Sequence, residues 1–269
     1  MKLIESKVEV IEQQPGLDGM YKQIELAGRT CYKSEDKITE DSAKEFVDRM
    51  IKSKHGAMLE HGTVYLITTD PAIGKWYKDN KFSISKRLGS FYENDSAVAK
   101  YYITTNLRVI VENNWFRHLD YLSEPTKFHE KRITARFTCD RGVSHEIVRH
   151  RVMSFAQESQ RYVGYDKDKF GSEVTFIKPH WYDEEFPTCL TWIESLKDAE
   201  KRYMELREAG LKPQDARGVL PNATKTEIVV TGFESDWEHF FELRTAGAAH
   251  PDMRKLALEL QEKLNSVNK

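Results

Sequence analysis

The order in which strand-type and helix-type patterns follow one another is the strongest constraint on the fold of this chain. Five stretches either alternate apolar and polar residues or are rich in β-branched and aromatic residues, as strands are. Helical patterns separate some of them at irregular intervals. Because there is no regular alternation of strand and helix, the pattern predicts an α+β fold with a mixed or antiparallel sheet and packed helices. The expected strands are residues 2–12, 63–69, 101–111, 132–139 and 226–233.

Helices are expected where apolar residues recur every three or four positions. A capping box of the type Ser-x-x-Glu starts two of them, and a proline at the first helical position starts the last. Residues 70–131 follow neither period clearly, and we interpret them as a decorated insertion in a single domain of residues 1–269. The expected helices begin at Ser42, at Ser235 and at Pro251, and a further helix that stops near Gly210 carries an apolar stripe from Trp192 to Leu206.

Charge and cysteine content limit the possible functions. The formal net charge is −2, so the chain lacks the broad basic surface that a nucleic-acid coat requires. Its three cysteines lie far apart and form no CxxC pair, which argues against a zinc knuckle or a disulfide framework. The first residues are charged and alternating, and no apolar run reaches membrane-spanning length. A cytoplasmic protein without nucleic-acid or membrane partners is therefore expected.

Two common kinds of cofactor motif are excluded. Neither GxGxxG nor GxxxxGK[ST] occurs, so the usual glycine-rich phosphate loops are missing. HEIVRH, residues 145–150, resembles a zinc-protease motif, but its second histidine comes one position late. Arg149 stands where that ligand belongs, and arginine stays protonated. No metal site is predicted.

Residues 149–162, RHRVMSFAQESQRY, form a cationic run in a chain of nearly balanced charge. The local pattern predicts that Ser144 caps a short helix through Arg151 and that residues 157–163 then run extended. In the extended part, every second side chain shares one face. That face would present an amide, a hydroxyl and a guanidinium group.

Hydroxyl and guanidinium groups together suit a phosphate monoester. Each charge-assisted bond contributes about 1.5–3 kcal/mol, so a few of them reach the roughly 8 kcal/mol of a micromolar affinity. One alternative is that these arginines are surface residues paired with some of the 43 acidic side chains. Another is that the run, with its tyrosine, follows the backbone of a single-stranded nucleic acid.

The cationic run also resembles the signature RHR-x7-S of the flavin-dependent thymidylate synthases, with Ser159 as its last residue. The likeness covers most of residues 20–70 and 132–265, in the order of that family. Further segments that resemble the family are AGRTCY (27–32), HGAMLEH (55–61), ARGVLP (216–221) and FFELR (240–244).

The resemblance implies the fold of that family and its reaction, the reductive methylation of dUMP to dTMP. It implies methylenetetrahydrofolate as the carbon donor, NADPH acting through FAD as the hydride source, and a homotetramer with sites shared between subunits. The implied FAD contacts are His55, Arg149, His150, Arg151, Gln157 and His239. The implied dUMP contacts are Glu146, Gln157, Glu158, Ser159, Gln160, Arg161, Arg217 and Arg244. Among these, Arg217 is expected to reach from another subunit.

Arg244 is the implied catalytic residue, which in the family contacts the uracil ring. Its spacing gives independent support. It follows Trp237 by seven residues and Phe240 by four, so it lies on the apolar stripe of its helix. A charge directed inward needs a partner or a ligand. The alternative is that the side chain reaches water at the helix end.

Several positions depart from the family pattern. Phe233, Ser235 and His239 stand where asparagine and arginine often contact the adenine end of FAD, so residues 70–131 are an alternative source of those contacts. Two other readings remain: a relative that keeps the fold without activity, and another flavin-dependent nucleotide-modifying enzyme on this scaffold. The other replaced positions are Cys31, Glu146 and Gln157.

Overall fold

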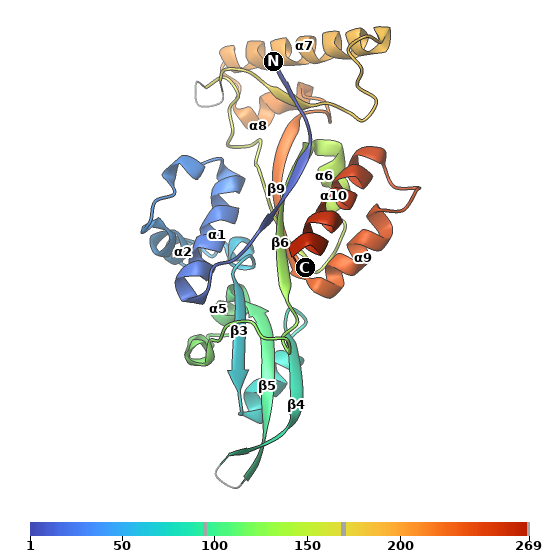
Figure 1. The fold of residues 1–269 in the computed structure, drawn as a ribbon. Coiled ribbons are helices and arrows are strands. Elements are labelled where there is room, and N and C mark those ends of the chain that lie inside the picture. The colour runs from blue at the N-terminus through green and yellow to red at the C-terminus, as the bar shows by residue number, and fades with distance from the viewer. Residues whose placement is uncertain (94–95, 168–170, 268–269) are drawn as a thin grey trace.

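The computed structural model describes residues 1–93, 96–167 and 171–267, which combine helices with mostly antiparallel strands (Figure 1). At its centre is a four-stranded antiparallel sheet. This arrangement confirms the predicted α+β class. Across the sheet the strands are β2 (Lys7–Ile11), β6 (Arg132–Asp140), β9 (Lys225–Phe233) and β7 (Ser154–Gln157).

Helices pack on both sides of the central sheet, and β9 contributes side chains to both cores. Val229 belongs to the core with α1, α2 and α3, whereas Ile228 and Val230 belong to the core with α6, α9 and α10. Successive side chains of a strand point to opposite faces, which explains this division. Figure 1 shows α1 and α2 on one side and α9 and α10 on the other. The bounds are α1 (Gly16–Tyr32), α2 (Ser42–Lys52), α3 (Gly56–Leu59), α6 (Arg141–Ile147), α9 (Glu234–Arg244) and α10 (Pro251–Val267).

Residues 70–131 build a second sheet with β3 (Thr63–Thr68), in the order β3–β5–β4. The predicted strand 101–111 is correct as far as Asn106 and wrong beyond it. The side-chain oxygen of Asn106 accepts a hydrogen bond from the backbone N of Val109 (3.2 Å), which starts a helix instead. The elements of this segment are α4 (Pro71–Lys78), β4 (Ile84–Glu93), β5 (Ser96–Asn106), α5 (Leu107–Glu112) and η2 (Phe116–Tyr121).

The predicted strand 2–12 is divided between two sheets. β1 (Lys2–Ile4) pairs in parallel with β8 (Thr175–Ile177), whereas β2 pairs with β6. A third hydrophobic core lies next to β1 and β8. It contains the buried side chains of Leu196 and Tyr203, which confirm the predicted apolar stripe of α7. No helix in the described ranges is both long enough and apolar enough to cross a membrane. The remaining elements are η1 (Glu35–Lys37), α7 (Pro187–Glu208), α8 (Pro213–Ala216) and η4 (Arg217–Val219).

The helix starts are predicted more accurately than their caps. α2 begins at Ser42 and α10 at Pro251, as expected. Ser42 does not cap its helix, because its hydroxyl donates to the carboxylate of Glu25 (2.8 Å). α9 begins one residue before Ser235, and the carboxylate of Asp236 accepts the bond that ties down its first turn.

Candidate active site

Helix α6 carries the first candidate residues and starts earlier than the pattern predicts. The carboxylate of Asp140 accepts a hydrogen bond from a backbone N of the first turn (2.7 Å), so Asp140 is the cap. Ser144 lies inside the helix, and the prediction that it caps the helix is wrong. The helix also ends at Ile147 instead of continuing to Arg151. The cationic run therefore begins outside the helix.

Arg149 and Arg151 are exposed in the turn after α6. Within the part of the chain that the structure describes, neither guanidinium group has a hydrogen bond or an ion pair. The surface ion pairs that one alternative requires are thus not formed by these two arginines. Both cations remain available to an anionic ligand.

The histidine between them, His150, is buried against Phe240 of α9, with ring centroids 4.9 Å apart. Arg244 donates from Nε to Nε2 of His150 (2.9 Å), from Nη1 to Oε2 of Glu146 (2.5 Å) and from Nη2 to the carbonyl of Glu146 (3.0 Å). The prediction that Arg244 is directed at an internal partner is confirmed. Burial, together with the charge of Arg244, lowers the pKa of His150 to about 4, so its ring is neutral at neutral pH.

A second group of candidates surrounds the buried carboxylate of Glu158, directly after β7. Glu158 accepts from Nζ of Lys225 (2.8 Å), which also pairs with Glu227 (2.6 Å). Lys33 pairs with Glu227 as well (2.9 Å). Burial alone would raise the pKa of Glu227, but Lys225 and Lys33 outweigh it and lower that pKa to about 2. Together with Glu35, which also pairs with Lys33 (3.3 Å), these side chains form a charged network that fixes Glu158.

The chain turns at Ser159, which contradicts the predicted extended course of residues 157–163. Two backbone N–H groups further along donate to the carbonyl oxygen of Ser159 (3.2 and 3.1 Å), and its own N–H donates to the carbonyl of Cys31 (3.0 Å). Helix α1 thus draws the chain away from β9. Gln157 and Arg161 do not share a face: the amide of Gln157 donates to a hydroxyl of α6 (2.8 Å), whereas Arg161 is exposed.

Arg141 is a candidate residue that sequence reasoning missed. Among the described residues, its half-buried side chain makes one long hydrogen bond, from Nη1 to the hydroxyl of Thr226 (3.4 Å). Burial lowers the pKa of Arg141, and the nearby charge of Arg217 lowers it further. The charge of the predicted Arg217 thus acts on Arg141 within one chain, and in the described ranges neither has an ion pair. Gln160 lies in the same neighbourhood, beside the phenol of Tyr165.

Strand register is the signal that would have pointed to Arg141 and Lys225. Asp140 pairs with Lys225 across β6 and β9, so the end of one strand meets the start of the other. A cation stands at each of these two ends. Neither segment alone reveals the pairing, because register is set by the whole sheet.

The two other histidines among the predicted site residues, His55 and His239, lie on either side of the cationic run. His55 is exposed beside a groove of about 650 Å³ between α1 and α2, with Nδ1 3.5 Å from the hydroxyl of Tyr32. The ring of Tyr32 in turn lies 5.8 Å from that of Tyr162. His239 is exposed on α9, and its ring lies 6.1 Å from the ring of His150.

A cavity of about 170 Å³ joins the unusual positions of α9 to the segment 70–131. Phe233 and Ser235 line it together with Lys81 and Phe82. Ser154, just after the cationic turn, lines it as well. Residues of the insertion thus lie beside two of the positions that depart from the family pattern.

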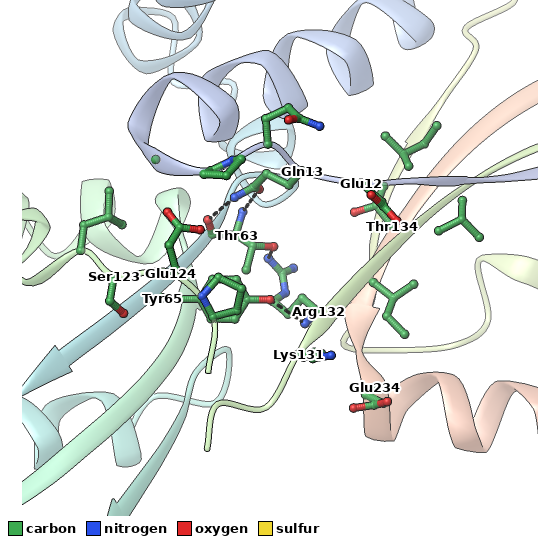
Figure 2. Close-up of a pocket in the computed structure, with 18 of the residues that line it drawn as sticks. Glu12, Gln13, Thr63, Tyr65, Ser123, Glu124, Lys131, Arg132, Thr134 and Glu234 are labelled. Atoms are coloured by element: carbon green, nitrogen blue, oxygen red, sulfur yellow. Dashed lines mark hydrogen bonds between the residues drawn. The ribbon is translucent and has the colours of Figure 1, made fainter. Parts of the chain in front are cut away.

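The pocket in Figure 2 is separate from these residues. It measures about 400 Å³ and lies between the β2–α1 connection and the first residues of β3 and β6. Gln13 exchanges two hydrogen bonds with the backbone of Thr63 (2.9 and 2.8 Å), and Tyr65 accepts one from the backbone N of Arg132 (3.2 Å). None of the predicted site residues lines it.

Comparison with known proteins identifies similar sequences. The family model described as thymidylate synthase complementing protein matches residues 91–268. A flavin-dependent thymidylate synthase of Pyrococcus furiosus is 32% identical over 154 residues, which cover 57% of this chain and 62% of that protein. One of Thermococcus kodakarensis is 34% identical over the same shares. The chain therefore matches less than two thirds of the length of these relatives.

Among solved structures, the chain is similar to a UMP/dUMP methylase, PolB, of Streptomyces cacaoi bound with 5-Br dUMP. The identity is 17% and the TM-score 0.46, over 99% of this chain and 93% of that one.

Proposed function

Because the chain belongs to the thymidylate synthase complementing protein family, we propose that it is a flavin-dependent thymidylate synthase that methylates dUMP to dTMP. The observation that carries this proposal is the cationic run itself. Its three exposed arginines, Arg149, Arg151 and Arg161, have no acidic partner among the described residues, and the histidine between the first two is bonded to Arg244. Unpaired guanidinium groups next to Arg244, which is already held in place, can bind two anionic ligands side by side: a flavin cofactor and a nucleotide.

Arg149 and Arg151 would hold FAD, because two free guanidinium groups match the charge of its pyrophosphate. His55, His239 and Gln157 would border the same cofactor, and His150 would stand behind it. Bound flavin would supply the hydride chemistry, with NADPH as the reductant and methylenetetrahydrofolate as the carbon donor.

The nucleotide would bind at the turn after β7, with its phosphate near Ser159, Arg161, Arg217 and Arg141. Arg141 and Arg217 repel one another in the free protein, and an anion between them would remove that repulsion. The amide and carboxylate groups of Gln157, Glu158, Gln160 and Glu146 would line the rest of this site.

Arg244 would act on the uracil ring. A guanidinium group held in advance next to the base favours negative charge on the ring, which raises the nucleophilicity of C5. Its three bonds to Glu146 and His150 hold it without help from substrate. Arg244 is therefore already oriented when the substrate binds, so little free energy is needed to reorganise it during the reaction.

The proposal includes a homotetramer, because Arg149 and Arg151 are open to solvent in a single chain and a second subunit would close the site over them. It also includes a cytoplasmic location, where the three free cysteines would stay reduced.

The proposal is tested by incubating purified protein with dUMP, methylenetetrahydrofolate, NADPH and FAD. We expect dTMP to form only when all four are present. Product that forms equally well without FAD or NADPH would contradict the proposal. If flavin and dUMP bind but no dTMP forms, the reaction is another flavin-dependent modification of the nucleotide.

A further inference from the structure

The ring of His150 faces into the protein, unlike its two neighbours in the sequence. It is 6% exposed and packs at an angle of 62° against the ring of Phe240. Its Nε2 lies 2.9 Å from Nε of Arg244. The charged and titratable groups around this contact are Arg244 and His239 from α9 and Glu146 from α6.

The direction of this hydrogen bond follows from the chemistry of its partners. Arginine has five N–H donors, no acceptor, and a proton that it does not lose in proteins. His150 must therefore accept at Nε2, which requires a neutral ring with its proton on Nδ1. A protonated ring would offer a second cation to Arg244 instead of a lone pair.

We propose that His150 is a positioning residue, whose neutral ring fixes the direction of Arg244 toward the substrate. The inference rests on the proposed function, and it assigns the middle residue of the cationic run a task different from that of Arg149 and Arg151. A free arginine side chain samples many rotamers. If Glu146 were its only partner, the guanidinium group would be held at its two Nη atoms, and its plane could still rotate about the line that joins them. The bond at Nε fixes that plane, and orientation of this kind is a large part of catalysis.

Two substitutions distinguish the contribution of the hydrogen-bond acceptor from that of the imidazole ring. His150→Gln keeps a side-chain oxygen close to the place of Nε2 and cannot be protonated, whereas His150→Leu keeps the volume and removes the acceptor. We expect His150→Leu to lower kcat about ten- to a hundredfold at saturating FAD, with a much smaller change in KM for dUMP. His150→Gln should restore most of kcat.

Outcomes that overturn the proposal are distinct. Full kcat in His150→Leu would show that the acceptor is not needed. An equal loss in both variants would assign the effect to the ring. Weaker FAD binding in both, with normal kcat once FAD is saturating, would make His150 a cofactor contact instead. Thermal unfolding of both variants identifies a loss that is due to misfolding.

A second measurement does not depend on activity. ¹⁵N NMR of the histidine rings in the ligand-free protein reports which nitrogen carries the proton. We expect His150 to stay neutral with its proton on Nδ1 from pH 8 to pH 5, and its pKa to rise in Arg244→Ala, where the neighbouring cation is gone. A proton on Nε2, or titration near pH 6.5, would overturn the proposal even if the enzyme proved to catalyse a different reaction.

Discussion

Replacing Arg244 with alanine is expected to slow dTMP formation by about two to three orders of magnitude while FAD stays bound. Removal of one preorganised group that stabilises developing charge lowers kcat on the order of 10² to 10³-fold. Arg244 makes three bonds that hold it in place before substrate binds. The flavin remains because Arg149 and Arg151 are untouched. Steady-state kinetics and the visible spectrum of the purified variant measure the two effects.

Arg244→Lys is the matched control for this substitution. Lysine keeps the positive charge but cannot make the flat set of bonds to Glu146 and His150. We expect an intermediate rate, which would separate the contribution of charge from that of orientation. Wild-type turnover in Arg244→Ala would remove Arg244 from the reaction. Because Glu146 is partly exposed, the loss of its partner should cost little stability, which thermal unfolding checks.

Replacing Arg141 with alanine is expected to weaken dUMP binding about 10- to 100-fold. A hydrogen bond to a charged group contributes about 1.5–3 kcal/mol, and each 1.4 kcal/mol is a factor of about ten in Kd. The loss should be smaller, roughly two- to tenfold, for Ser159→Ala, which removes a neutral hydroxyl. Calorimetric titration of each variant with dUMP gives both values.

Arg136→Ala is the control for Arg141. Arg136 lies on β6, the strand that leads into Arg141, but its guanidinium is already paired with the carboxylate of Glu9 (2.6 and 2.9 Å). Its removal should leave the Kd for dUMP unchanged. A Kd that is unaltered in Arg141→Ala, or weakened equally in Arg136→Ala, would exclude Arg141 from the phosphate site.

The sequence predicted three strands of the central sheet, β2, β6 and β9, and the apolar faces of α7 and α10, because these depend on local periodicity, whereas it missed β7. It failed where a single side chain decides the course of the chain. Asn106 and Asp140 each cap a helix with a side-chain oxygen: Asn106 ends a strand that the pattern prolonged to residue 111, and Asp140 starts α6 before the predicted cap at Ser144. Short polar side chains compete in this way with the backbone hydrogen bonds between strands, and they do not change the hydrophobic period of the sequence.

The candidate site was predicted only in part, and the residues that were missed come together through the pairing of whole strands. The resemblance named Glu146, His150 and Arg244, and the structure brings these three together although nearly a hundred positions separate the first from the last. It did not name Arg141 or Lys225. Their proximity depends on the register of β6 against β9, which is a property of the sheet and of neither strand alone.

The central claim is that one site holds a flavin and a nucleotide monophosphate together, and a dUMP titration of the FAD-loaded protein tests it most directly. The visible absorption of the flavin is recorded as dUMP is added. We predict a band that shifts and saturates, because a base next to the flavin changes its surroundings. Bound flavin that does not respond to dUMP, or a protein that retains no flavin, would contradict the claim.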